Sequence, residues 1–286
     1  MQKLTHAWLQ QVNAEYRRDQ VPAKKRPWLA WRQWIKHTGR PVELSDDVTK
    51  QIFDWFERHT TAGRQYVGPI YTGAFYYDSC FWPVIVPLVF GRVQVSAWDG
   101  LKTMPPFVMK QLWREQAEVK EYAVHWANCI DYAFGIDEVM KRPGLSQFTL
   151  ELLKSGGQQM KAIVSLLLDG DRPNSKAAES AAMATEIFLK AFLSSKALLT
   201  EDEAKRKVGH NLEEALRRCA AVDPKSELLN IRPDLDVLPS ISERYRGSEM
   251  PLGVLWRSYE IAQFIGTTVC RSLTGRDTRK TLRVPV

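Results

Sequence analysis

The chain has 286 residues, of which 44% are hydrophobic and 26% are charged, a composition typical of a folded protein rather than of a long disordered one. This length is sufficient for two modest hydrophobic cores. Forty Lys and Arg against 33 Asp and Glu give a formal net charge of +7, which would attract an anion such as nucleic acid at low salt.

Segments that would direct the chain out of the cytoplasm are not evident. The longest apolar stretch, Cys80–Phe90, is shorter than the roughly 18 residues that cross a bilayer, and Pro83 and Pro87 interrupt it. The N-terminal sequence lacks the basic, apolar and small-residue order of a signal peptide. We therefore expect a cytoplasmic protein that does not enter a membrane.

Cysteine and histidine positions do not indicate a metal site. The four cysteines form no CxxC pair, which in a cytosolic protein indicates free thiols. His125 and Cys129 are spaced one helical turn apart and could supply two zinc ligands, but no third ligand is evident nearby, so we interpret them as core residues. Motifs of phosphate loops, hydrolases and zincins are also missing. We expect no metal and no cofactor.

Positive charge is spread along the sequence. Residues 1–145 hold 19 basic and 15 acidic residues, and the rest hold 21 and 18, so neither half is a basic module by itself. Short basic runs occur at Arg17-Arg18, at Lys24-Lys25-Arg26 and in the C-terminal RDTRKTLR. Both solvated surface and anion binding are open interpretations of these runs.

The first part of the chain predicts short helices that contain many tryptophans. Ser45 is a plausible N-cap for a helix in which Val48, Ile52 and Trp55 share one face. This spacing indicates a core, although aromatic residues among basic ones can also stack single-stranded bases. The tryptophans in question are Trp8, Trp28, Trp31, Trp34 and Trp55.

From Tyr66 to Met104 the sequence favours strands. Aromatic and β-branched residues alternate with Gly and Pro, which predicts two or three strands with turns near Gly91 and at Asp99-Gly100. A long helix is predicted from about Pro106 to Phe134. Pro143-Gly144 ends this part, so the predicted domains are residues 1–145, with α+β structure, and residues 146–286.

The second part is helical by its pattern. Helices are predicted at 148–168, 177–193 and 252–273, with a loop of about 20 residues at 221–239. Three capping boxes predict helix starts: Thr200 with Glu203, Asn211 with Glu214, and Ser240 with Glu243. The predicted fold class is therefore mainly α, with a C-terminal antiparallel helical bundle and an N-terminal α+β domain that contains a small antiparallel sheet.

One run in the second part resembles a known family. Residues 176–212 read KAAESAAMATEIFLKAFLSSKALLTEDEAKRKVGHNL, an alanine-rich helix with a Glu186/Lys190 pair, then a short charged helix and a Gly-His-Asn-Leu step. This run is similar to the AxExxLKAxL helix and the His-containing step of HEPN domains. The resemblance covers residues 148–273 and implies a helical bundle that forms a homodimer.

Many HEPN proteins are metal-independent ribonucleases in which an Arg and a His, with four to six residues between them in the sequence, meet across the dimer. An imidazole can transfer the protons of RNA cleavage, and a guanidinium stabilises charge on the phosphate. Here only three residues separate Arg206 from His210, and Lys205 has the right spacing but an ammonium group, which cannot grip phosphate bidentately. The usual ribonuclease motif is therefore missing.

Other members of the family carry the histidine without the nuclease motif. For His210 three roles stay open: a structural residue at a helix start, a contact to an anion or nucleotide, or a catalytic group with Arg206. Lys205, Lys207, Arg244 and Tyr245 are the other candidate binding residues. For Arg244 and Tyr245 the alternative is a structural tie between the loop and the bundle.

The hypothesis from the sequence is a non-catalytic HEPN-type protein that binds nucleic acid or nucleotide. A prokaryotic toxin-antitoxin or phage-defence context is implied by the resemblance alone. One alternative is a metal-independent endoribonuclease with a variant motif. Another is a subunit that interacts with a protein partner in a larger complex.

Overall fold

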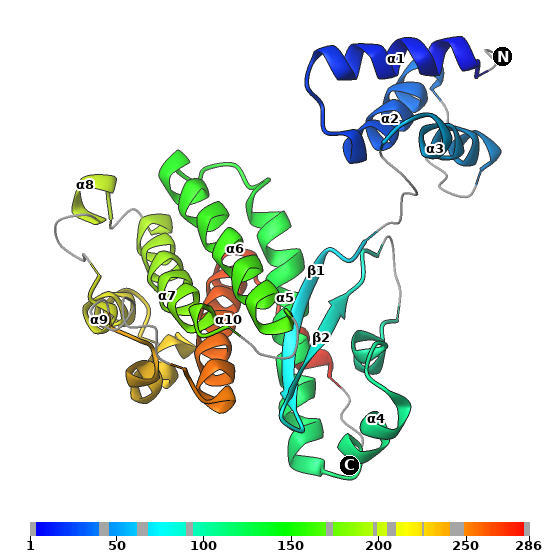
Figure 1. The fold of residues 1–286 in the computed structure, drawn as a ribbon. Coiled ribbons are helices and arrows are strands. Elements are labelled where there is room, and N and C mark those ends of the chain that lie inside the picture. The colour runs from blue at the N-terminus through cyan, green and yellow to red at the C-terminus, as the bar shows by residue number, and fades with distance from the viewer. Residues whose placement is uncertain are drawn as a thin grey trace. The chain divides into compact units, whose positions relative to one another are not determined.

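The computed structural model describes residues 4–39, 46–61, 68–89, 94–169, 174–196, 199–204, 210–224, 226–240 and 249–282. Within these residues the protein is mainly α-helical with a two-stranded antiparallel sheet, which confirms the predicted fold class. The chain forms two compact units, Met1–Gly68 and Pro69–Val286 (Figure 1). None of the described helices is long and apolar enough to cross a membrane.

The first unit is built from three helices, α1 (His6–Arg18), α2 (Arg26–Thr38) and α3 (Asp47–His59). Trp34 and Trp55 are buried in its small core, as the core interpretation of the tryptophan spacing predicts. The other three tryptophans of this unit, Trp8, Trp28 and Trp31, are half-buried.

The predicted N-cap of α3, Ser45, lies outside the described residues. The side chain of Asp46 accepts a hydrogen bond from the N–H of Thr49 at 2.7 Å, so Asp46 caps the helix. An aspartate oxygen satisfies a free N–H of the first turn as well as a serine oxygen would.

The second unit begins with a hairpin of β1 (Tyr71–Tyr77) and β2 (Cys80–Val86). Its turn is Asp78-Ser79, where both residues have positive φ, 52° and 58°, a geometry of two-residue hairpins that usually selects Asn or Gly. The turn predicted at Asp99-Gly100 is wrong, because these residues belong to a 3₁₀ helix, Ala97–Leu101. Gly91 lies outside the described residues.

Pro83 occupies a strand without breaking the ladder. It is paired with Ala74, and the N–H of Ala74 donates to the hydroxyl of Tyr259 at 3.2 Å rather than to β2. The backbone groups of this pair therefore point away from the partner strand, where the missing N–H of proline costs no ladder bond.

The long helix predicted from Pro106 is two helices, α4 (Pro106–Leu112) and α5 (Gln116–Val139). Between them the N–H of Arg114 bonds the carbonyl of Gln111, and the N–H of Glu115 bonds that of Leu112. These tighter three-residue bonds close α4 before α5 begins.

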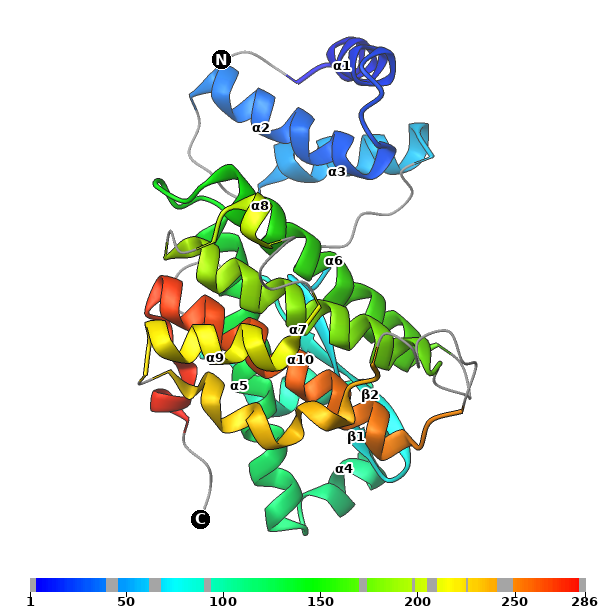
Figure 2. The same ribbon diagram turned by 90° about the vertical axis from the view of Figure 1, so that its left-hand side faces the viewer.

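The helical bundle follows the predicted order. It contains α6 (Gln147–Leu168), α7 (Lys176–Ser195), the single turn α8 (Glu201–Glu203), α9 (Leu212–Val222) and α10 (Leu252–Thr274). α7 packs against α6, α9 and α10 (Figure 2), and alanines make up much of its buried surface. Small side chains allow these neighbours to approach closely.

Two of the predicted caps are present. Thr200 and Glu203 form the capping box of α8, and the side chain of Asn211 accepts from the N–H of Glu214 at the start of α9. Ser240 is described, but its predicted partner Glu243 is not.

The loop predicted at 221–239 is largely a 3₁₀ helix, Glu227–Val237. It buries Leu228, Ile231 and Leu235 against the bundle. Helices with three residues per turn lack the 3.6-residue pattern, which explains why the sequence suggested a loop.

The boundary between the two compact units lies between Gly68 and Pro69 in the sequence, whereas the sequence predicted a boundary between residues 145 and 146. The reason for the difference is a single hydrophobic core in the second unit, shared by the hairpin, α5, α6, α7 and α10. The turn at Pro143-Gly144 therefore connects elements of one core and does not separate two.

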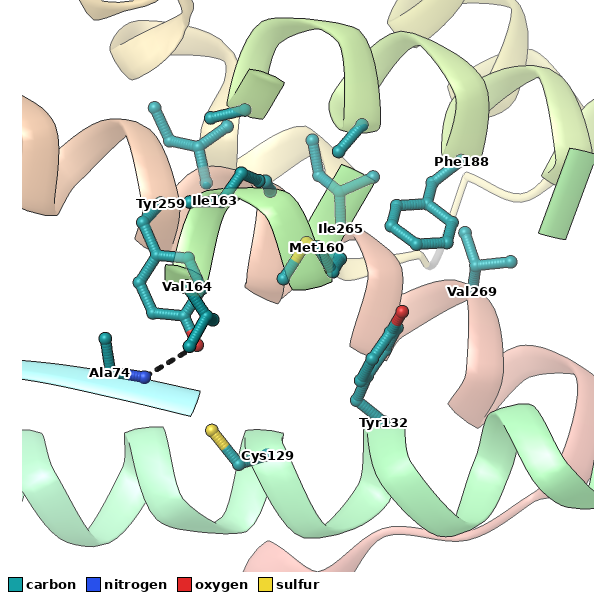
Figure 3. Close-up of a cluster of buried hydrophobic side chains, with 14 of the residues drawn as sticks. Ala74, Cys129, Tyr132, Met160, Ile163, Val164, Phe188, Tyr259, Ile265 and Val269 are labelled. Atoms are coloured by element: carbon teal, nitrogen blue, oxygen red, sulfur yellow. Dashed lines mark hydrogen bonds between the residues drawn. The ribbon is translucent and has the colours of Figure 1, made fainter. Parts of the chain in front are cut away.

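Phe188 of α7 is fully buried at the centre of this core, among Tyr132, Met160 and Val269 (Figure 3). Its ring lies against Gly156 of α6 and Gly266 of α10, and a Cβ built on these glycines would come within 2.6 and 2.8 Å of ring carbons. Because Gly156 has no side chain, it leaves room for the aromatic ring of Phe188. The Gly156-Gly157 pair does not interrupt α6.

The two neighbouring glycines of α6 should respond differently to alanine. Gly157→Ala meets only the Tyr132 hydroxyl at 3.5 Å and should stabilise the helix by up to about 1 kcal/mol. Gly156→Ala gains the same helix propensity, but its Cβ collides with the ring of Phe188, which should cost about 1–3 kcal/mol in strain. Urea unfolding of both variants should therefore rank Gly156→Ala below Gly157→Ala by about that strain. Equal stability would show that the ring is not packed against Gly156.

Candidate functional site

Glu186, Lys190 and His210 form a polar cluster on the helical bundle. The Glu186 carboxylate accepts a hydrogen bond from Lys190 Nζ at 2.7 Å through Oε1 and lies 3.0 Å from His210 Nδ1 through Oε2. Side-chain exposure is 9% for Glu186, 12% for Lys190 and 64% for His210. A buried carboxylate thus holds an exposed imidazole ring by one nitrogen.

The position of this cluster follows from the packing of α7. Glu186 and Lys190 are one turn apart on α7, a spacing that lets the two side chains pair. His210 immediately precedes Asn211, the N-cap of α9. α9 is held against α7 through the buried Cys219, whose Sγ lies 3.6 Å from the carbonyl oxygen of Leu189. The docking of α9 therefore brings His210 to Glu186.

The hydrogen bond to Glu186 determines which atoms of His210 face a ligand. When Nδ1–H donates to the carboxylate, a neutral ring presents its Nε2 lone pair to solvent, and a protonated ring presents an N–H donor. A carboxylate oriented in this way fixes the tautomer of the ring. The arrangement suits contact with an anion and also proton transfer.

The backbone N–H groups in the first turn of α9 are less suited to bind an anion than the imidazole ring of His210. The side chain of Asn211 occupies the N–H of Glu214, and Glu213 and Glu214 place two carboxylates in the first turn. These charges already interact with the positive end of the helix dipole. Arg217 and Arg218 are both bound to Glu214, so a ligand at this cluster depends on His210 first.

The sequence identified His210 but missed its partner. The Glu186/Lys190 pair is recognisable from its spacing, yet nothing in the sequence shows that it meets a ring 24 residues further along. A glutamate on the buried face of a helix was the available signal, because such a group needs partners. The remaining candidates, Lys205, Arg206, Lys207, Arg244 and Tyr245, lie outside the described residues.

His125 and Cys129 lie close together but inside the core, as their core interpretation predicts. Their Nε2 and Sγ atoms are 3.5 Å apart, and both side chains are buried. Burial lowers the pKa of His125 to about 4 and raises the pKa of Cys129. The described residues contain no group of three or more His, Cys, Asp or Glu that could hold a metal ion.

A second polar region is a cavity of about 370 Å³ between the hairpin and α5. Burial, followed by repulsion from Glu121 and Glu115, raises the pKa of Glu118 at its wall. Glu121 accepts from the indole N–H of Trp256 at 3.2 Å. The complete lining is Tyr76, Tyr77, Asp78, Gln111, Glu115, Glu118, Glu121 and Trp256.

Comparison with known proteins identifies no relative of this chain. No family model, no curated protein and no solved structure matches it. The function must therefore be argued from the geometry of the molecule and from the resemblance of the 176–212 run.

Removal of the Glu186 carboxylate should destabilise the bundle. Glu186→Ala leaves the ammonium of Lys190 buried without its partner, which should cost on the order of 3 kcal/mol of unfolding free energy. Glu179→Ala removes a carboxylate from the exposed Lys176–Glu179 pair of the same helix and should cost less than about 1 kcal/mol. Denaturant unfolding measures both, and similar losses would contradict the role assigned to Glu186.

Stability should also depend on the ionisation of Glu260 on α10. Burial raises the pKa of Glu260 to about 7, although its pairing with Arg257 opposes the shift. The folded state therefore favours the protonated acid, and the resulting stability is present below pH 4.5 and lost as the pH rises through 7. As the pH rises from 4.5 to 7, the unfolding free energy of Glu260→Gln should therefore increase by roughly 3 kcal/mol relative to that of the wild type.

Unfolding measured at acidic and at mildly alkaline pH tests this dependence. Glu151→Gln, which changes an exposed carboxylate of α6, is the control and should follow the wild type. A constant difference between Glu260→Gln and wild type across the pH range would contradict the prediction.

Proposed function

We propose that the protein binds nucleic acid or a nucleotide through a HEPN-type C-terminal bundle, without cleaving it, and that the bundle forms a homodimer. The observation that supports this function is the exposed ring of His210, fixed at Nδ1 by the buried Glu186. A toxin-antitoxin or phage-defence setting is part of the same proposal, by resemblance to the HEPN family.

The cluster carries no net negative charge that would repel an anionic ligand. Glu186 and Lys190 cancel, so the formal charge of the cluster is set by His210: zero with a neutral ring and +1 with a protonated one. Lys205, Arg206 and Lys207 shortly precede His210 in the sequence, and they are the other cations that the proposal assigns to this region.

Absence of cleavage follows from the chemistry that the motif lacks. RNA cleavage needs one group to take the 2′-hydroxyl proton, one to protonate the leaving oxygen and a cation on the phosphate. Arg206 does not have the family spacing, and Arg217 and Arg218 are engaged by Glu214. Binding requires only the ring and nearby positive charge.

Variants of the candidate residues test the binding function. His210→Ala, and separately Arg206→Ala/Arg244→Ala, should lose affinity for RNA or nucleotide at low salt, by about tenfold if a charge-assisted bond is lost. Lys161→Ala, which removes an exposed cation of α6, is the matched control. Gel shifts that show wild-type affinity for both test variants would refute the assignment. Little affinity in the wild type itself would favour the protein-interaction hypothesis.

A ribonuclease is the second candidate, because the Glu186–His210 hydrogen bond also orients an imidazole for proton transfer. Incubation of the protein with total RNA in EDTA separates the two functions. The binding proposal predicts intact RNA at high protein concentration. Cleavage that His210→Ala abolishes would establish the enzyme instead.

A further inference from the structure

The two units differ sharply in charge. Residues 1–68 contain 12 Lys and Arg against 7 Asp and Glu, a formal +5, which leaves 28 and 26, or +2, for residues 69–286. A division at residue 145 conceals this difference. Most of the net positive charge of the protein therefore belongs to the small first unit.

Within this unit the cations gather on one segment. Residues 20–42 contain six Lys and Arg and no acidic residue, whereas the α3 segment, 46–59, contains four acidic and two basic residues. Among the described cations of the first segment, Lys24, Lys25, Arg32 and Lys36 are exposed. None of these four forms an ion pair with a described residue.

Helical geometry aligns three of these cations. At 100° per residue, Lys25, Arg32 and Lys36 fall within about 40° of one another around the axis of α2 and its preceding turn. The adjacent face contacts α1, since Arg26 bonds Asn13 and Tyr16 bonds Gln33. The face on the other side of these cations contacts α3.

The contact with α3 is made by Trp28, whose ring centroid lies 4.6 Å from that of Phe53, and by Trp31, whose indole N–H donates to the hydroxyl of Thr49. Lys25, Arg32 and Lys36, here called the α2 stripe, thus lie on the side of α2 that neither neighbouring helix covers.

We propose that the α2 stripe is a binding surface for the phosphate backbone of nucleic acid. From Lys25 to Lys36 there are 11 residue steps, or roughly 16 Å at 1.5 Å per step, a length over which one strand of a duplex presents about four or five phosphates. The site lies on a different unit from His210 and does not rest on the role of His210.

The composition of the stripe distinguishes nucleic acid from other anionic partners. A helix that lies on a membrane needs an apolar face toward the lipid, but the buried residues of α2, Pro27, Ala30 and Trp34, point into the core. A protein partner would need buried anchors at the centre of its interface. The α2 stripe consists of cations alone, and the nearest apolar residue on the helical wheel, Leu29, is half-buried. Cations without apolar anchors suit a polyphosphate.

The test measures binding of the full chain to labelled duplex DNA, duplex RNA and single-stranded RNA by fluorescence anisotropy, between about 50 and 200 mM salt. Arg32→Glu/Lys36→Glu should weaken binding at least about tenfold at low salt and reduce the slope of log K against log salt by about 2, since two phosphate contacts are lost. Arg32→Gln/Lys36→Gln should show a smaller loss in the same direction. Circular dichroism should show that both variants remain folded.

Lys154→Glu/Lys161→Glu is the matched control, because it makes the same change in net charge on exposed residues of one face of α6. Wild-type affinity in this control, together with loss in the α2 variant, supports the proposal whether the preferred strand is DNA or RNA. An equal loss in both variants, or none in the α2 variant, would overturn it.

Two further measurements keep the proposals distinct. Loss of binding in His210→Ala but not in the α2 variant would support the function of the bundle and overturn the α2 site. Loss of binding in the α2 variant but not in His210→Ala would support the α2 site and overturn the function of the bundle. Vesicles that contain phosphatidylserine should not bind; binding to vesicles that the α2 variant abolishes, without binding to nucleic acid, would also overturn the assignment.

Discussion

The burial of α7 is the constraint on which the candidate site depends. This helix packs against α6, α9 and α10, so the carboxylate of Glu186 lies where water cannot solvate it freely. A buried charge without partners costs folding free energy. Lys190 donates only one of the hydrogen bonds that the carboxylate can accept. The second donor is His210, and the position of its ring is therefore set by the core and not by a loop alone.

The same core explains why the protein is divided as it is. The hairpin and α5 contribute to the interior around Phe188 together with the bundle, so most of the chain is one cooperative unit with a nearly balanced charge. The first unit has its own small core, which includes Trp34 and Trp55, and it holds most of the net positive charge. In the two proposals, one unit supplies electrostatic attraction to a polyanion, and the other supplies a specific contact through an oriented imidazole.

The sequence predicted what local patterns determine. The alanine-rich α7, the final helix α10 and the caps at Thr200 and Asn211 follow from periodicity and from hydrogen bonds within a few residues. A small antiparallel sheet was expected, but not a hairpin that turns at Asp78-Ser79, because these two residues adopt positive φ without glycine. The break between α4 and α5 has no proline or glycine to mark it.

Long-range packing decided what the sequence did not predict. The division at Gly68 depends on contacts between the hairpin and helices far along the chain, whereas Pro143-Gly144 is a stronger local signal in the wrong place. His210 was identified from a short motif, but its contact with Glu186 required the docking of α9 on α7. The basic character of the first unit became visible only after the division was known.

In the proposed function, the ring of His210, held by Glu186, contacts the ligand through Nε2. Two-dimensional ¹H–¹⁵N NMR of the histidine rings, with His210→Gln to assign the signals, measures this directly during titration with RNA. The account predicts that the Nε2 signal of His210 shifts on binding while Nδ1 remains a hydrogen-bond donor. Unchanged ring signals at saturating RNA, or an Nδ1 that carries no proton in the free protein, would contradict it.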